Sequence, residues 1–100
     1  MSEPTEGMGQ PSSGRYVVSP DAAYAAVPGG GVVLHLGVNR YFSLNDTAAM
    51  IWSMLEAGST TDVITGELAR RFDIDAASAQ RAVVELVDRL SHAGLLRPAD

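Results

Sequence analysis

Histidines are the side chains best suited to proton transfer or metal binding in this sequence, and there are two, His35 and His92. Cysteine is absent, which excludes thiol catalysis, disulfide bonds and thiolate metal sites. Neither histidine has another histidine at metal-ligand spacing. His35 lies among aliphatic residues, and His92 lies near the end of an expected helix, where a positive charge suits the helix dipole. We interpret both as structural, and expect no catalytic residue, no metal site and no cofactor.

Two carboxylate pairs and one glycine cluster could also do chemistry, but each has a simpler interpretation. Asp73 and Asp75 bracket a linker, where Asp75 can cap the helix that follows. Glu85 and Asp88 share one face of an expected helix, either as solvated surface or as contacts for a basic partner. The glycines at 29–31 precede a strand, whereas a phosphate-binding loop precedes a helix. We therefore do not expect an enzyme.

Length and charge narrow the classes of function further. One hundred residues form one small domain with a modest core. The seven basic residues are all arginines, and twelve acidic residues give a net charge of −5. Because nucleic acids and anionic membranes attract positive charge, we expect neither as a partner. No apolar run approaches the roughly 20 residues that span a bilayer, and the N-terminus lacks the features of a secretory signal. We expect a cytoplasmic protein.

The chain divides into an expected tail and one expected domain. Residues 1–14 are rich in Gly, Pro, Ser and Glu, which predicts a disordered tail. The domain is expected over residues 15–97. Its first half contains strand candidates at residues 16–18, 32–36 and 40–44. Residues 22–27 are a weaker strand candidate because of their alanines, and helix stays open there.

The second half predicts three helices, over residues 47–56, 62–72 and 76–92, each preceded by residues that can cap it. In the second helix, the spacing places Val63, Ile64, Leu68 and Phe72 toward the core. Leu95 and Leu96 are expected to fold back under the core. The order predicts an α+β domain, a small antiparallel sheet of two or three strands followed by three α-helices, with a winged-helix-like arrangement.

The strand over residues 40–44 is the feature that indicates a function. Residues 37–39 predict a tight reversal, so this strand pairs with residues 32–36 and has no obvious later strand on its other side. An uncovered strand edge can accept a peptide as an additional strand. Tyr41 and Phe42 point to opposite faces, because strand side chains alternate. One of them is expected to enter the core, and the other can line a groove.

A second apolar row, Val84 and Val87, lies beside the core positions of the third helix, with Arg81 and Asp88 next to it. The row is either additional core or the far side of a groove along the free strand. In the second case, a peptide would gain main-chain hydrogen bonds from the strand and side-chain contacts from the helix. The same free edge could instead pair two copies in a homodimer.

Several segments, in their order along the chain, resemble a known family. They are an aliphatic strand and a turn, Arg-Tyr-Phe-x-Leu-Asn (40–45), Ile-Trp-x-x-Leu (51–55), Gly-Ser-Thr (58–60), and Val-x-x-Leu-x-x-x-Gly-Leu-Leu (87–96). Together they resemble the PqqD-like family, the precursor-peptide recognition elements of ribosomally synthesised and post-translationally modified peptides (RiPPs). Among free-standing members, the chain is most similar to the B1 proteins of lasso-peptide biosynthesis.

The resemblance implies a winged-helix-like fold that has no catalysis of its own and binds the leader segment of a precursor peptide as an added strand. The partners that it implies are this leader peptide, a separate leader peptidase and an ATP-dependent macrocyclase. Carried over onto this sequence, the leader-binding residues are Asn39, Arg40, Tyr41, Phe42, Ser43 and Leu44 on the strand, and Arg81, Val84, Val87 and Asp88 on the third helix.

Two alternatives remain open. The chain could serve as a PqqD-like chaperone for a radical SAM enzyme or another RiPP-modifying enzyme. A winged-helix DNA-binding regulator would share the fold, but it needs a basic recognition helix. The third helix carries Arg81 and Arg89 against Glu85 and Asp88, so its charge balance is neutral and DNA binding is the weaker interpretation.

Overall fold

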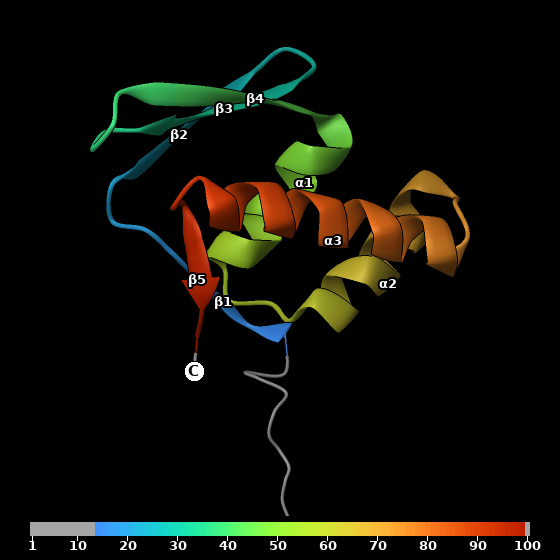
Figure 1. The fold of residues 1–100 in the computed structure, drawn as a ribbon. Coiled ribbons are helices and arrows are strands. Elements are labelled where there is room, and N and C mark those ends of the chain that lie inside the picture. Colours follow the sequence, from blue (N-terminus) through green and yellow to red (C-terminus); the bar gives the residue numbers. More distant parts are fainter. Residues whose placement is uncertain (1–13, 100) are drawn as a thin grey trace, which may run out of the picture.

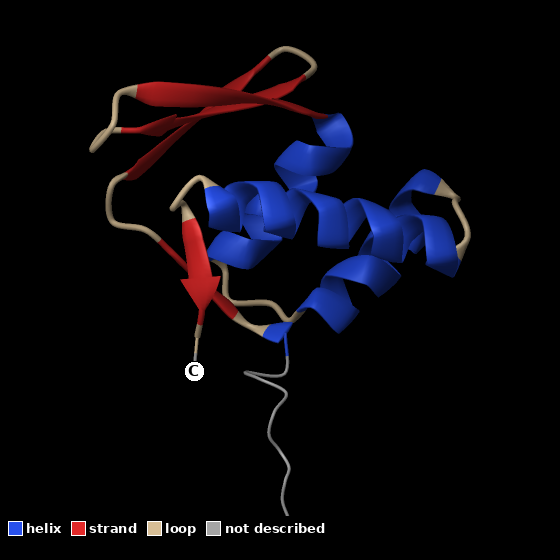
Figure 2. Ribbon diagram, in the orientation of Figure 1, coloured by secondary structure: helices blue, strands red, loops and turns tan. Residues whose placement is uncertain are grey.

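A computed structural model describes residues 14–99 of the protein. The elements in chain order are β1 (Tyr16–Val18), β2 (Ala22–Val27), β3 (Gly30–His35), β4 (Arg40–Asn45), α1 (Asp46–Glu56), α2 (Thr61–Phe72), α3 (Ala76–His92) and β5 (Leu96–Pro98). Figure 1 shows the sheet of β2, β3 and β4 above the three helices, with a ribbon of β1 and β5 at the other end. The three-stranded sheet and the helices occupy separate layers, whereas the β1–β5 ribbon lies beside the helices (Figure 2). The predicted α+β fold is confirmed, while the tail predicted over 1–14 lies outside the described residues except for Gly14.

The three-stranded sheet is antiparallel, and its order β2-β3-β4 leaves β4 at an edge. Residues 36–39 connect β3 to β4, with His35 opposite Arg40. Within this turn Asn39 has a φ of 56°, a conformation that Asn adopts more readily than most residues. The reversal predicted at 37–39 is therefore present, and it aligns β4 antiparallel to β3 along six residue pairs.

Each helix begins at a side-chain cap. The N–H of Ala48 donates to Asn45 Oδ1 at 2.8 Å, that of Val63 to Thr60 Oγ1 at 3.2 Å, and that of Ser78 to Asp75 Oδ1 at 2.9 Å. These bonds satisfy N–H groups that have no partner inside the helix. Hydrogen bonds from the side chain and the backbone N–H of Ser78 lower the pKa of the Asp75 carboxyl below its ordinary value, because they favour the ionised form.

Left-handed residues end all three helices. Gly58 and Gly94, with φ of 89° and 78°, follow α1 and α3. After α3, the N–H of Leu95 donates to the Leu90 carbonyl at 2.9 Å, and the N–H of Gly94 to Ser91 at 3.1 Å, which is the Schellman arrangement. Asp73 takes the corresponding position after α2 with a φ of 54°. Within residues 14–99, no helix has the length and apolar character needed to cross a membrane.

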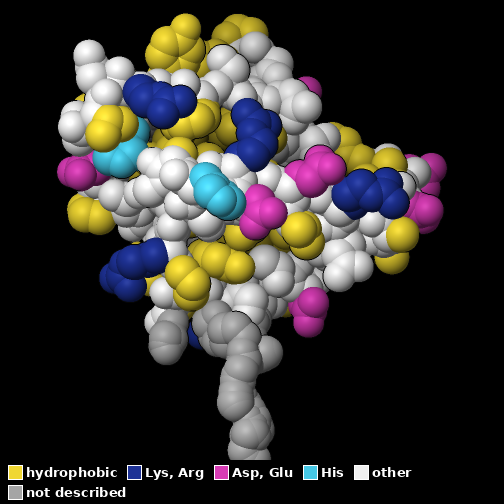
Figure 3. All heavy atoms as spheres, viewed as in Figure 1, with side chains coloured by type: hydrophobic (Ala, Val, Ile, Leu, Met, Phe, Trp, Pro, Cys, Tyr) yellow, Lys and Arg dark blue, Asp and Glu magenta, His cyan; other side chains and the backbone are white. Residues whose placement is uncertain are grey.

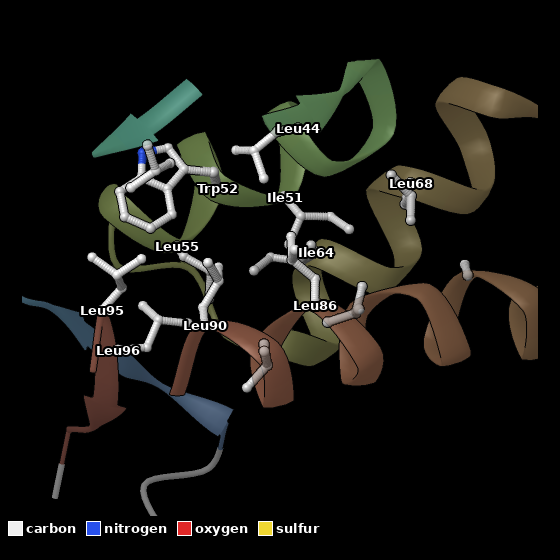
Figure 4. Close-up of a cluster of buried hydrophobic side chains, with 14 residues drawn as sticks. Leu44, Ile51, Trp52, Leu55, Ile64, Leu68, Leu86, Leu90, Leu95 and Leu96 are labelled. Atoms are coloured by element: carbon white, nitrogen blue, oxygen red, sulfur yellow. The ribbon is translucent and has the colours of Figure 1, made fainter. Parts of the chain in front are cut away.

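The core lies between the sheet and the helices and continues among the helices (Figure 4). Trp52 of α1 is fully enclosed, and its ring stacks on Tyr24 of β2 with the centroids 6.2 Å apart. The sheet, all three helices and the C-terminal segment contribute to this buried cluster, which comprises Val33, Leu44, Ile51, Trp52, Leu55, Ile64, Leu68, Ala79, Val83, Leu86, Val87, Leu90, Leu95 and Leu96. Packing of β4 on the helices therefore fixes the position of the strand edge.

Some details differ from the sequence-based expectations. Residues 22–27 form a strand, so the helical alternative is wrong. Val63 and Phe72 do not face the core, since 56% and 40% of their surfaces are exposed. The buried arc of α2 is narrower than predicted and centres on Ile64 and Leu68. Leu95 and Leu96 are buried as expected, but the chain then continues as β5, a strand that was not predicted and that pairs with β1.

Candidate functional site

Main-chain hydrogen bonds of β3 determine which groups of β4 face the free edge. The N–H of Leu36, just after β3, donates to the carbonyl of Asp21 at 2.9 Å and so points toward the β2 side. Main-chain groups of an antiparallel strand alternate between its two sides. Val33, three residues earlier, therefore directs its N–H and C=O toward β4, where its register partner is Phe42.

Residues of β4 alternate in the same way. Phe42 pairs with β3, and so do Arg40 and Leu44, two residues to either side. Tyr41 and Ser43 consequently turn their N–H and C=O groups toward the uncovered edge. These groups form the row at which an additional strand can pair.

The side chains of β4 alternate between the two faces of the sheet. Leu44 is buried, and Phe42 is half-buried against the core, so both face the helices. Tyr41 lies on the opposite face, with 70% of its surface exposed. Of the two aromatic residues, Phe42 is therefore the one that lies between β4 and the helices.

Two pockets lie beside α3, one toward β4 and the other toward the end of β4 and the start of α1. One, the Phe42 pocket, has a volume of about 370 Å³ and is lined by Arg40, Phe42, Asp88, Arg89, His92 and Ala93. The other, of about 180 Å³, is lined by Asn45, Thr47, Ala48, Ile51, Ala82, Glu85, Leu86 and Arg89. Because Arg89 borders both, we call the two pockets together the β4–α3 groove. The groove borders β4 at Arg40, Phe42 and Asn45, and its second pocket lies mainly between α1 and α3.

The four helix residues expected to contact a peptide lie in different surroundings in the structure. Asp88 lines the Phe42 pocket. Val87 is buried in the core, with 6% of its surface exposed. Val84 is 52% exposed and, like Arg81, lines neither pocket. As leader contacts, all four stay predictions.

The groove uses a neighbouring row of α3 that the sequence interpretation did not assign to leader binding. Ala82, Glu85, Arg89 and His92 lie three or four residues apart and so share one flank of the helix. This spacing is visible in the sequence, but so are the spacings of the other rows. Only the rotation of α3 about its axis, fixed by core packing, shows which row faces β4.

Basic groups predominate around the Phe42 pocket. The guanidinium of Arg40 lies over the ring of Phe42, 5.7 Å from its centroid. The Nδ1 of His92 lies 2.9 Å from the carbonyl oxygen of Asp88. A carbonyl can only accept, so Nδ1 carries a proton in this arrangement. Figure 3 shows basic and histidine side chains, with acidic ones among them, on the face where α3 runs below the sheet.

Residues 14–99 contain no group of three or more His, Cys, Asp or Glu side chains placed to hold a metal ion. The one ion pair found in this part of the chain joins Arg70 to Glu67 on α2. Arg40, Asp88 and Arg89 are thus without ion-pair partners among the described residues. The site therefore consists of a strand edge, two shallow pockets and several unpaired charges.

A family model described as coenzyme PQQ synthesis protein D (PqqD) matches residues 30–96. The chain belongs to the PqqD family. The matched residues run from β3 through α3 to the start of β5, so both sides of the β4–α3 groove lie within them. The resemblance predicted from the sequence is confirmed.

Two solved structures share the fold of this PqqD-family chain. One is TbiB1 in complex with the TbiA(beta) leader peptide, with 26% identity and a TM-score of 0.74, covering 80% of this chain and 93% of that one. The other is a lasso peptide synthetase B1 complexed with the leader peptide, with 27% identity and a TM-score of 0.76, covering 84% of this chain and 99% of that one. No match was found among curated protein sequences.

Proposed function

We propose that this protein binds the leader segment of a ribosomally synthesised precursor peptide and presents it to the maturation enzymes of lasso-peptide biosynthesis. The observation that carries the proposal is the uncovered edge of β4 beside the β4–α3 groove. Two proteins of the same fold were solved with leader peptides. A strand edge offers main-chain hydrogen bonds to any peptide, and the adjacent pockets discriminate among side chains.

The leader would add to the sheet as a strand along residues 39–44. The N–H and C=O groups of Tyr41 and Ser43 would pair with its main chain. Side chains of the added strand alternate, so every second one points into the β4–α3 groove. The others lie on the face that carries Tyr41. This geometry predicts that binding depends on the leader with a period of two residues.

In this proposal the protein supplies recognition, and other proteins carry out the covalent steps. For a lasso pathway these are a separate leader peptidase and an ATP-dependent macrocyclase, acting in the cytoplasm. The family match fits a second candidate equally well, in which the protein delivers a leader to a radical SAM enzyme or another modifying enzyme. Both candidates use the same leader-binding site, so they differ only in the enzyme whose reaction the protein accelerates.

Fluorescence anisotropy with a labelled leader peptide, encoded beside this gene, tests the proposal. We expect saturable binding at micromolar or tighter concentration. A series of leaders N-methylated at one residue each should show losses of roughly tenfold at alternate positions, because each such change removes one main-chain donor. A leader bound as a helix would show a different period. Uniform insensitivity across the series would rule out strand addition.

A pair of phenylalanines provides a matched control. Phe42→Ala removes a ring from the groove, whereas Phe72→Ala removes one from the end of α2, outside both pockets. We expect weaker leader binding only for Phe42→Ala, with folding checked by circular dichroism. A labelled DNA duplex runs in parallel. Salt-sensitive DNA binding without a leader response would replace the proposal with a regulatory function.

A further inference from the structure

The Phe42 pocket has an excess of positive charge in an acidic protein. Arg40 and Arg89 border it from opposite sides, one on β4 and one on α3, and Asp88 is the one carboxylate in its lining. The whole chain carries a net charge of −5. None of the three side chains has an ion-pair partner within residues 14–99. The pocket therefore presents two unpaired guanidinium groups against one carboxylate.

We propose that the Phe42 pocket recognises an acidic side chain, Asp or Glu, of the leader peptide. The inference rests on the proposed leader-binding function and adds the chemistry of one leader position. Guanidinium groups form short, charge-assisted hydrogen bonds with carboxylates, and these are stronger than bonds between neutral groups. A carboxylate between Arg40 and Arg89 also lowers the repulsion between the two cations.

His92 already uses one ring nitrogen for a contact within α3. Its Nδ1 proton is directed at the Asp88 carbonyl, 2.9 Å away, so this proton is not available to an incoming carboxylate. Donation to the incoming carboxylate is assigned to Arg40 and Arg89, because guanidinium groups are always charged and present several donors. Phe42 and Ala93 form the apolar part of the lining, and they can contact the methylene groups that carry the carboxylate.

The main-chain geometry indicates which leader residue is involved. Tyr41 and Ser43 face the free edge, so the leader residues paired with them point to the Tyr41 face of the sheet. The leader residue between these two lies opposite Phe42 and points to the helix side. Its side chain reaches the Phe42 pocket. One leader position should therefore show the charge preference, and its two neighbours should not.

A positional scan of the leader measures this preference. Each residue of the strand-adding segment is replaced in turn by Glu, Gln and Lys, and the affinities are measured by anisotropy with wild-type protein. We expect one position at which Glu binds roughly tenfold more tightly than Gln, and Lys more weakly than Gln. The preference should shrink in high salt, since the pocket is open to solvent.

Protein variants assign the preference to the pocket. Arg40→Gln and Arg89→Gln should each reduce the ratio of Glu to Gln affinity at that position to less than threefold. Arg71→Gln, on α2 and outside both pockets, changes the net charge equally and should leave the ratio unchanged. All three arginines are exposed, so circular dichroism should show folded variants.

The outcomes separate the two proposals. If the unsubstituted leader binds but no position prefers Glu over Gln, the pocket assignment is wrong and leader binding stands. The same conclusion follows if the preference survives in both Arg40→Gln and Arg89→Gln, or if Arg71→Gln abolishes it equally. If the unsubstituted leader does not bind at all, the proposed function itself is wrong, and the pocket assignment fails with it.

Discussion

Gly31 of β3 lies directly beneath the ring of Tyr24 of β2. A Cβ atom on Gly31 would lie 2.7 Å from Cζ of that ring, and closer still to Cε1 and Oη. The ring has little freedom to move away, because it stacks on Trp52 of the core. The absence of a side chain at Gly31 therefore lets the sheet pack on α1. Packing therefore accounts for the glycine at this position, and a phosphate-binding role is not needed to explain it.

Gly31→Ala should lower the free energy of unfolding by about 1–3 kcal/mol, since the new methyl group displaces the Tyr24 ring. Urea unfolding measures the loss, and near-UV circular dichroism reports the altered surroundings of Trp52. In a Tyr24→Ala background, the same substitution should cost less than about 0.5 kcal/mol. An equal cost in both backgrounds would show that the ring is not the cause.

Gly66→Ala should stabilise the protein. Gly66 lies within α2, and a Cβ atom there would meet no other atom within 4 Å. Alanine in a helix interior is favoured over glycine by roughly 0.5–1 kcal/mol, which corresponds to a rise in Tm of about 2–8 °C for a domain of this size. Gly94→Ala is the contrasting variant: its φ of 78° disfavours a side chain, so Tm should fall. A lower Tm for Gly66→Ala would contradict the helix assignment.

Asp75→Asn should make the free energy of unfolding fall less steeply as the pH is lowered into the acid range. The pKa of Asp75 is lowered in the folded protein, so its ionised form stabilises the fold above the unfolded-state pKa. That contribution disappears as the pH falls below about 4. Asparagine keeps an oxygen acceptor at the cap but does not titrate. Urea unfolding between pH 6 and pH 3 should show a steeper loss for the wild type than for Asp75→Asn, and parallel curves would contradict this.

Val84→Asp and Val87→Asp should differ in their effects on folding. Val87 lies in the core, so a buried carboxylate should unfold or strongly destabilise the protein, whereas Val84 is exposed. We expect Val84→Asp to keep the wild-type Tm within a few degrees and to weaken leader binding less than Phe42→Ala does. A larger loss of affinity for Val84→Asp would place the leader on the Arg81 and Val84 side of α3 instead of in the β4–α3 groove.

Local patterns made much of the fold predictable. The caps at Asn45 and Asp75 act within three residues, so they mark helix starts without any knowledge of tertiary structure. Strand β5 has only three residues and forms because β1 lies beside it, about eighty residues earlier in the chain. Such a pairing leaves no local pattern. Val63 has helical spacing with the core residues, yet no element within residues 14–99 covers it.

Some features of the candidate site could also be predicted from local sequence patterns, and others could not. The free edge of β4 follows from a hairpin whose two strands are neighbours in sequence, so it could be predicted. Which face of α3 borders the groove could not be predicted, because it depends on how far the helix is rotated when Val83 and Leu90 pack into the core. The same rotation places Arg89 and His92 beside the groove. The alternation of Tyr41 and Phe42 was predictable, but which of them faces the helices was not.

The pairing of β1 with β5 brings the two ends of the folded unit together, with Tyr16 opposite Pro98. Figure 1 shows this ribbon at the end of the molecule away from the three-stranded sheet. A unit whose ends are adjacent can be inserted into a surface loop of another protein without stretching either chain. Grafted into a modifying enzyme in this way, the domain would hold the sheet that contains β4 at the end away from the host, and each captured substrate would stay tethered close to the host's active site.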